Sequence, residues 1–295
     1  MKNISKQIEI PTLNQITNLE HPKRKKLKVV TLNYLPTAYQ FVTDWIAENG
    51  HEHALAVTTP GPKSRPTPSY LDVLKLIPRN VNTLVTTKIK TVLTPILRQL
   101  KPDVILCYSF PYRITAEICQ IPTYGAINIH PSVLPLYRGP NPMRQFYEGA
   151  QIFGSTAHRI SADYDTGEIL SQQSAPLPEK VTHKTSVIWG EMIKKCIAEG
   201  MDKAISKVAG ITQDHSRATY AAPYTDEEKW INFHEPTSVV LRKTLGLNLT
   251  GGLARAAING QVYKIHSAQS YAIDINKSAG TIIKQEAGVF VIATL

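Results

Sequence analysis

The sequence predicts an α/β protein in which a mostly parallel sheet is followed by a small β-barrel-like C-terminal domain. Three observations support this prediction. Apolar, strand-like runs alternate with helical stretches from residue 27 to about residue 206, a pattern typical of parallel sheets. Short strands separated by glycine turns follow near the C-terminal end, as in small barrels and sandwiches. The chain has 295 residues, which exceeds the usual size of a single domain and favours two.

The elements of the first domain follow from local composition. Residues 27–35 are rich in β-formers and predict the first strand. A helix is predicted from about 38 to 49, because Gly50 is a suitable residue to end it. The apolar run at 103–108 (DVILCY) is typical of a buried parallel strand. The remaining predicted elements are strands at 53–58, 82–86, 125–130 and 155–160, and helices at 70–76, 94–100 and 183–206.

Four regions are predicted along the chain: an N-terminal arm at 1–26, the α/β domain at 27–206, a linker at 207–222 and a small C-terminal β domain at 223–295. Asn259-Gly260 in the last region is a strong signal for a tight hairpin turn. The final run VFVIATL ends within a predicted strand, which leaves open whether this domain is complete or clipped. Its predicted elements are a helix at 239–245 and strands near 253–258, 261–266, 280–284 and 289–293.

Charge and cysteine usage narrow the class of protein. The formal net charge of +10 favours an anionic partner such as nucleic acid, a phosphorylated substrate or a polyglutamylated cofactor, or else a solvated basic surface. The three cysteines form no C-x-x-C and have no histidine at zinc-ligand spacing, so we expect no metal site and a reducing, cytoplasmic location. We expect neither a membrane span nor a secretory signal. The sequence contains no dinucleotide glycine pattern and no P-loop.

Polar side chains with chemical potential gather between residues 125 and 170. Side chains alternate along a strand, so Asn128 and His130 share one face, and Pro131 ends the strand directly after them. Open α/β sheets bind ligands at such carboxyl ends. Asp165 lies 35 residues after His130, in a turn closed by Gly167 that is able to present one carboxylate inwards. Without further context, a structural Asn-His pair and an ordinary turn remain the alternative interpretation.

The run Asn128-Ile129-His130-Pro131-Ser132-Val133-Leu134-Pro135, with Arg138-Gly139, His158 and Asp165-Thr166-Gly167, resembles the folate-dependent formyltransferases. The resemblance covers about residues 27–205, and its motifs occur together and in order. It implies a Rossmann-like formyltransferase domain, 10-formyltetrahydrofolate as the formyl donor, and catalytic roles for Asn128, His130 and Asp165.

Elementary chemistry agrees with these implied roles. When a neutral amine attacks a formyl carbon, the formyl oxygen gains negative charge. The Asn128 amide and a protonated His130 are able to donate to that oxygen, and one such donor is worth on the order of 3 kcal/mol. Asp165 would hold His130 in its cationic form and accept the amine proton through a water.

The resemblance also implies residues that contact the folate or the other substrate, and each of them has a structural alternative. Residues 106–113 would lie beside the pterin ring, although a strand end with a proline turn is the alternative. Ser132 would either adjoin the site or cap a turn, and Asp163 would be either a contact or a turn residue. Arg138 would bind an anionic part of a ligand or form a surface salt bridge, and His158 is expected to be structural. The folate-contacting set expected is Leu106, Tyr108, Phe110, Ser132, Leu134 and Asp163.

Two features favour the branch of the family that acts on charged initiator tRNA. Residues 219–235 (TYAAPYTDEEKWINFHE) resemble the start of that branch's C-terminal domain. The basic, proline-rich loop at 60–69 lies where that branch carries a tRNA-contacting insertion, so Lys63 and Arg65 are expected to contact phosphates. Two departures, GLNLTGGL at 246–253 and Pro140-Asn141-Pro142 after Arg138-Gly139, keep a small-molecule amine acceptor open. A hydrolase that releases formate and an inactive RNA-binding relative also remain, and the oligomeric state is open.

Overall fold

The computed structural model describes residues 25–61, 69–249, 251–271 and 276–295. Most of the predicted N-terminal arm therefore lies outside the described residues. The same holds for Lys63 and Arg65, the two expected phosphate contacts of the proline-rich loop, so their role stays a prediction.

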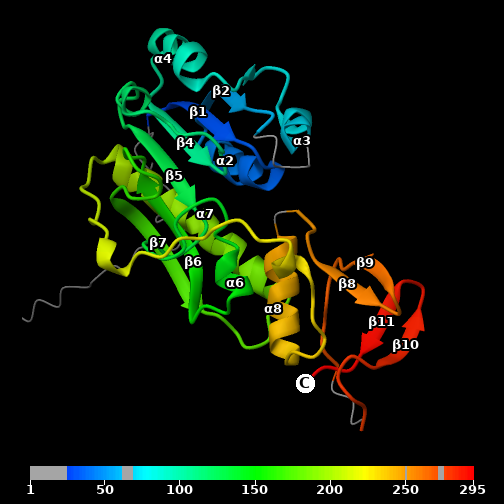
Figure 1. Ribbon diagram of the computed structural model, residues 1–295. Coiled ribbons are helices and arrows are strands. Elements are labelled where there is room, and N and C mark those ends of the chain that lie inside the picture. The colour runs from blue at the N-terminus through cyan, green and yellow to red at the C-terminus, as the bar shows by residue number, and fades with distance from the viewer. Residues whose placement is uncertain (1–24, 62–68, 250, 272–275) are drawn as a thin grey trace, which may run out of the picture.

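One seven-stranded sheet organises the first two thirds of the chain (Figure 1), with strand order β3-β2-β1-β4-β5-β6-β7. The pairs from β3 to β5 are parallel, whereas β6 pairs antiparallel with β5 and with β7. The predicted α/β fold with a mostly parallel sheet is confirmed. The strands are β1 (Lys28–Asn33), β2 (Glu52–Thr58), β3 (Asn82–Val85), β4 (Val104–Tyr108), β5 (Ala126–His130), β6 (Ile152–Arg159) and β7 (Ile169–Pro176).

Helices cover both faces of this sheet. Alternation along β1 sends Val29 toward one apolar cluster, which includes residues of α2 and α7, and Val30 toward a second one on the α4 and α5 side. The helices are α2 (Pro36–Glu48), α3 (Ser69–Leu76), α4 (Thr94–Leu100), α5 (Ala116–Cys119), α6 (Arg144–Tyr147), α7 (His183–Ile205) and α8 (Thr237–Asn248). Short helical turns occur at η1 (Ile89–Leu93), η2 (His215–Arg217) and η3 (Glu227–Lys229).

Strand β7 is an element that the sequence did not predict. Its residues, ILSQQSAP, include four consecutive polar side chains and no valine, threonine or aromatic residue. It lies at the edge of the sheet, where alternate side chains such as Gln172 and Ser174 face solvent. An edge strand needs little apolar sequence, so local composition carried too weak a signal.

The C-terminal region contains two antiparallel pairs, β8 (Arg255–Ile258) with β9 (Gln261–Lys264) and β10 (Ile282–Glu286) with β11 (Val289–Ile292). Among the described residues of this C-terminal region, these two pairs are the only sheets. The expected barrel-like domain therefore consists of two small sheets around a shared apolar cluster. The predicted turn joins β8 to β9, with φ of 50° at Asn259 and 76° at Gly260. In Figure 1, α8 lies between the large sheet and these hairpins. No described helix is both long and apolar enough to cross a membrane.

The connecting segment, residues 207–222, is bound to the first domain rather than free of it. Ile211 exchanges two backbone hydrogen bonds of 2.8 Å with Ile169 at the start of β7. Further on, the Arg138 N–H donates to the Thr219 carbonyl at 2.9 Å, and the Ala221 N–H donates to the Arg138 carbonyl at 2.7 Å. The segment, yellow in Figure 1, thus runs past β7 and along the loop that follows β5 before it reaches α8.

Candidate active site

Strand β5 places Asn128 and His130 on one face of the sheet at its carboxyl end, as the strand spacing predicts. Register pairs Asn128 with His158 on β6 and His130 with Thr156. The His130 side chain is almost fully buried, whereas Asn128 is half-buried. Two imidazoles and one amide therefore lie within one small region of the sheet.

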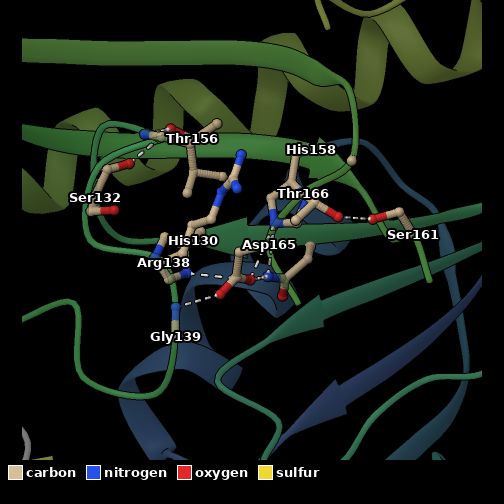
Figure 2. Close-up of polar contacts among 12 residues, drawn as sticks. His130, Ser132, Arg138, Gly139, Thr156, His158, Ser161, Asp165 and Thr166 are labelled. Atoms are coloured by element: carbon tan, nitrogen blue, oxygen red, sulfur yellow. Dashed lines mark hydrogen bonds and ion pairs between the residues drawn. The ribbon is translucent and has the colours of Figure 1, made fainter. Parts of the chain in front are cut away.

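The third predicted side chain, Asp165, reaches the same point from the turn between β6 and β7 (Figure 2). Its Oδ1 lies 3.5 Å from His130 Nδ1 and 3.6 Å from His158 Nε2, and it accepts a hydrogen bond of 3.3 Å from Asn128 Nδ2. Its Oδ2 accepts a hydrogen bond of 2.9 Å from the Gly139 backbone N–H. The amide, the imidazole and the carboxylate predicted from the sequence thus converge.

The hydrogen bonds of His130 define its resting protonation. Its Nε2 lies 2.7 Å from the Tyr137 carbonyl, which accepts only, so Nε2 carries a proton and Nδ1 faces Asp165. Burial lowers the pKa of His130, and the charge of Asp165 opposes that shift only in part. Burial therefore favours the neutral ring, whereas the charge of Asp165 favours the cationic His130 expected from the sequence.

Asp165 itself stays ionised. Burial favours its neutral form, but the adjacent His130 and His158 rings and the Gly139 N–H together hold its pKa far below the usual range. The carboxylate is thus a permanent negative charge at the centre of the cluster, available to stabilise a proton on either ring.

Asn128 is occupied by two acceptors in the resting site. Its Nδ2 lies 3.1 Å from His158 Nε2 and 3.3 Å from Asp165 Oδ1. His158 Nδ1 lies 2.8 Å from the Arg159 carbonyl, which places the ring proton on Nδ1 and leaves Nε2 to accept. His158 therefore holds the Asn128 amide, and a substrate oxygen must replace one of the two acceptors to receive its N–H.

Comparison with known proteins agrees with this geometry. The family model described as formyl transferase matches residues 79–187, and the one described as formyl transferase, C-terminal domain, matches residues 223–295. A methionyl-tRNA formyltransferase from Hydrogenobaculum sp. is 32% identical over 208 residues, which cover 66% of this chain and 67% of that protein. The chain belongs to the formyltransferase family. The resemblance stated from the site motifs is confirmed.

Two further matches show the extent of the similarity. The methionyl-tRNA formyltransferase of Syntrophomonas wolfei is 30% identical over 177 residues, 59% of this chain, and the chain spans only 56% of that relative's length. The fold is similar to that of HypX from Aquifex aeolicus, solved in complex with tetrahydrofolic acid, with a TM-score of 0.68 at 18% identity. That match covers 92% of this chain and 42% of the HypX chain.

The expected folate contacts of this formyltransferase chain divide into core and edge residues. Leu106 is fully buried in mid-sheet between β1 and β5, and Tyr108 is 5% exposed in the same apolar cluster. We therefore correct the expectation for Leu106 and assign it to the core, since neither its side chain nor its strand-paired backbone is open to a ligand. Phe110, just past the end of β4, is half-buried and packs edge-on against Tyr112 at 6.1 Å. Of the three, Phe110 alone presents a partly open aromatic ring.

The other expected contacts lie in the loop after β5 and in the turn between β6 and β7. Ser132 is fully buried and its Oγ donates to the Leu136 carbonyl at 2.8 Å, which is the turn-capping alternative. Leu134 is buried, and its N–H donates to Thr156 Oγ1 at 3.2 Å. Asp163 is exposed, and its carbonyl accepts hydrogen bonds from two hydroxyls of its own turn. These three residues shape the loops around the site.

Arg138 and a residue that sequence reasoning missed meet beside Asp165. Arg138 donates from Nε at 3.2 Å and from Nη2 at 2.6 Å to the side-chain oxygen of Gln213, in the connecting segment. The sequence predicted either a ligand contact or a surface salt bridge for Arg138. The structure instead shows hydrogen bonds to a neutral glutamine side chain. Gln213 was missed because a single glutamine in an aperiodic stretch carries no local signal. Within the part of the chain that the structure describes, no group of three His, Cys, Asp or Glu side chains is arranged to bind a metal.

Proposed function

We propose that this chain transfers a formyl group from 10-formyltetrahydrofolate to a primary amine, with the amino group of methionyl-tRNA as the preferred acceptor. The observation that carries the proposal is the convergence of Asn128 and His130 on Asp165, whose Oδ1 lies 3.3 Å from Asn128 Nδ2 and 3.5 Å from His130 Nδ1. Membership of the formyltransferase family supports it.

The residues fit a formyl-folate as the donor. That compound supplies an activated formyl group, and its transfer needs hydrogen-bond donors for the formyl oxygen and a path for one proton. Asn128 Nδ2 is a donor at the carboxyl end of β5, and Asp165 is an ionised acceptor beside it. The half-buried Phe110–Tyr112 pair offers an apolar aromatic surface for a ring system.

The reaction forms one bond and breaks another. The amine nitrogen bonds to the formyl carbon, and the bond from that carbon to the folate nitrogen breaks. The amine loses one proton, and the folate nitrogen that leaves takes up one proton. In our proposal the Asn128 amide stabilises the charge on the formyl oxygen. In its neutral form His130 has its Nδ1 lone pair on the side of Asp165, so it takes up the amine proton as a cation that the carboxylate then stabilises.

Three observations support methionyl-tRNA as the acceptor. The curated relatives reported above are methionyl-tRNA formyltransferases, and the C-terminal family model matches residues 223–295. The formal net charge of +10 suits a polyanionic substrate. Unpaired thiols at all three cysteines agree with a cytoplasmic setting for this reaction, which is part of the proposal.

The departure at residues 246–253 has a local explanation. Asn248 Nδ2 donates to the carbonyls of Ile265 and His266 at 2.7 and 3.0 Å, and its Oδ1 accepts from the Ala254 N–H at 3.2 Å. Asn248 thus joins the end of α8 to the C-terminal sheets. The change therefore has a structural role, and it gives little weight to a small-molecule acceptor.

A formyl-transfer assay tests the proposal. The chain is incubated with 10-formyltetrahydrofolate and, in separate reactions, methionyl-tRNA, a panel of amino sugars, ornithine derivatives or no amine. Folate release is followed by absorbance and product formation by mass spectrometry. We expect formylation of methionyl-tRNA at the highest kcat/KM. Selective formylation of an amino sugar or ornithine would reassign the acceptor. Formate release without an amine would indicate a hydrolase, and no release in any reaction would refute the activity.

A further inference from the structure

Gln213 is buried at the point where the connecting segment passes the reaction centre. It is 4% exposed, and Ile211, two residues before it, is fixed to β7 by two backbone hydrogen bonds. These two main-chain hydrogen bonds fix the connecting segment to β7 and so hold Gln213 in place.

The side-chain amide of Gln213 is fully used. Its Nε2 donates to the carbonyls of Asp165 at 2.9 Å and Gly167 at 2.7 Å. Its Oε1 accepts both hydrogen bonds of the Arg138 guanidinium. Two donors and two lone pairs are thus satisfied at once, a pattern that neither a carboxylate nor an apolar side chain is able to reproduce.

The turn that Gln213 contacts has an unfavourable backbone conformation. Asp165 has a backbone φ angle of 56°, a left-handed value that residues other than glycine rarely adopt. At Gly167 a Cβ atom would lie 1.8 Å from the Arg159 carbonyl oxygen, so the turn is pressed against the end of β6. Hydrogen bonds to the carbonyls on either side of Thr166 oppose relaxation of this turn, and the turn sets the direction of the Asp165 carboxylate.

Arg138 is oriented by the same amide without being neutralised. A neutral oxygen binds the guanidinium fork and leaves its positive charge available, whereas a glutamate at this position would cancel that charge. Among the described residues, no acidic side chain lies within ion-pair distance of Arg138 in this structure, although the charge of Asp165 acts on it from further away.

We infer that Gln213 is a positioning residue of this enzyme: through its amide it holds the Asp165 carboxylate at Asn128 and His130 and orients Arg138 toward the ligand. This inference rests on the proposed formyl transfer. It assigns part of the reaction centre to a segment that lies between the two regions matched by the family models.

The test compares Gln213→Met with Gln173→Met. Gln173 lies on β7 of the first domain, and its amide donates to Glu199 at 2.9 Å, away from the site. We expect Gln213→Met to lower kcat for formyl transfer by about tenfold to a hundredfold, because small displacements of a catalytic group are costly. Gln173→Met should keep the wild-type kcat. In an Asp165→Asn background Gln213→Met should cause a smaller loss than in the wild type, because part of its effect acts through Asp165.

A second readout does not depend on activity. The Gly139 N–H donates to Asp165 Oδ2, so its hydrogen exchange, measured by NMR, reports the position of the carboxylate. We expect exchange at Gly139 to be at least tenfold faster in Gln213→Met and unchanged in Gln173→Met. If the wild-type chain transfers no formyl group, the proposed function fails, while this exchange measurement still decides whether Gln213 positions Asp165.

Gln213→Glu covers the case in which the methionine variant does not fold. It keeps the side-chain length and the Arg138 contact but loses both donors, so the same fall in kcat is expected. Wild-type kcat with wild-type Gly139 exchange in either folded variant would overturn the inference, as would a kcat loss that adds fully to that of Asp165→Asn.

Discussion

Asp165 combines a buried charge with four polar neighbours, and this makes it the residue on which the proposed chemistry depends most. Asp165→Asn keeps the size of the side chain but removes its charge, so it no longer stabilises a proton on His130. We expect kcat to fall by at least about a hundredfold, the usual contribution of a general acid or base. Affinity for the folate should stay within about threefold, because no expected folate contact depends on that charge.

Steady-state kinetics and equilibrium folate binding check this prediction. Asp72→Asn is the matched control, since it removes one charge from an exposed pair with Lys75 on α3. If Asp165→Asn turned over at the wild-type rate, Asp165 would have no catalytic role.

His53 is a second titratable residue whose environment has a measurable consequence. Its Nε2 lies 3.0 Å from Thr31 Oγ1, its ring packs against Tyr39 at 5.8 Å, and burial lowers its pKa from 6.5 to about 4. Below pH 6.5 the unfolded chain therefore binds a proton that the folded chain does not bind until about pH 4. The free energy of unfolding should fall across this window, by at most about 3 kcal/mol from this residue.

Urea unfolding of wild type and His53→Gln between pH 7 and pH 4 tests this expectation. The variant should show a shallower decrease in unfolding free energy. The same change at His183, which is exposed at the start of α7, should leave the pH profile as it is. Parallel profiles for wild type and His53→Gln would contradict the prediction.

Part of the candidate site could be predicted from local sequence motifs, and part of it could not. The alternation of a strand was enough to place Asn128 and His130 on one face, and a turn motif was enough to bring Asp165 to them. Gln213 lies 48 residues beyond Asp165 and meets it only through tertiary contacts, so no local pattern identified it. The lowered pKa of His130 depends on its burial, and the position of its ring proton depends on the Tyr137 carbonyl; neither is encoded at His130 itself.

At the scale of elements, local pattern succeeded where a segment is strongly apolar or clearly delimited. The helix predicted at 94–100 has those bounds in the structure, and the buried strand β4 starts one residue after its predicted start. Pattern failed for β7, which is polar because it lies at a sheet edge. It also missed the short helices α5 and α6, whose four residues each are too few to show a helical period.

Helix α7 offers a matched pair of substitutions that probes packing against the sheet. A Cβ atom at Gly190 would meet Phe41 at an ordinary 3.5 Å, whereas at Gly200 it would lie 2.5 Å from the Ala157 Cβ on β6. We expect Gly190→Ala to stabilise the fold by about 0.5 to 1 kcal/mol through helix propensity. Gly200→Ala should destabilise it by about 1 to 3 kcal/mol, because α7 must move away from the strand. Chemical denaturation of both variants measures the two changes, and equal effects would contradict the packing shown.

At the scale of the whole molecule, Arg144 connects the two domains. It is buried on α6, forms two hydrogen bonds with Glu228 at 2.9 and 2.7 Å, and donates to the carbonyls of Ala222 and Pro223. Arg144→Met removes all of these hydrogen bonds, although Glu228 Oε2 still accepts from the Thr225 N–H and the Ala222 carbonyl still accepts from Asn141 Nδ2. We expect a loss of roughly 2 kcal/mol, at the lower end for a buried ion pair because Glu228 is partly exposed.

Calorimetry of Arg144→Met should also separate the unfolding of the C-terminal region from that of the sheet, because their junction is weakened. Arg98→Met, which removes an exposed pair with Glu117, is the control and should change stability by less than about 1 kcal/mol. A single unchanged transition in Arg144→Met would show that the junction does not depend on this arginine.

The path of the connecting segment also has a practical consequence for dividing the protein. Sequence patterns place the border of the first domain at residue 206, and a chain ended there would keep Asn128, His130 and Asp165. It would lose Ile211, Gln213 and Thr219, and with them the bonds that brace the Asp165 turn and the loop after β5. A minimal soluble fragment intended to retain the reaction centre should therefore extend to at least residue 222, where the last of these braces ends.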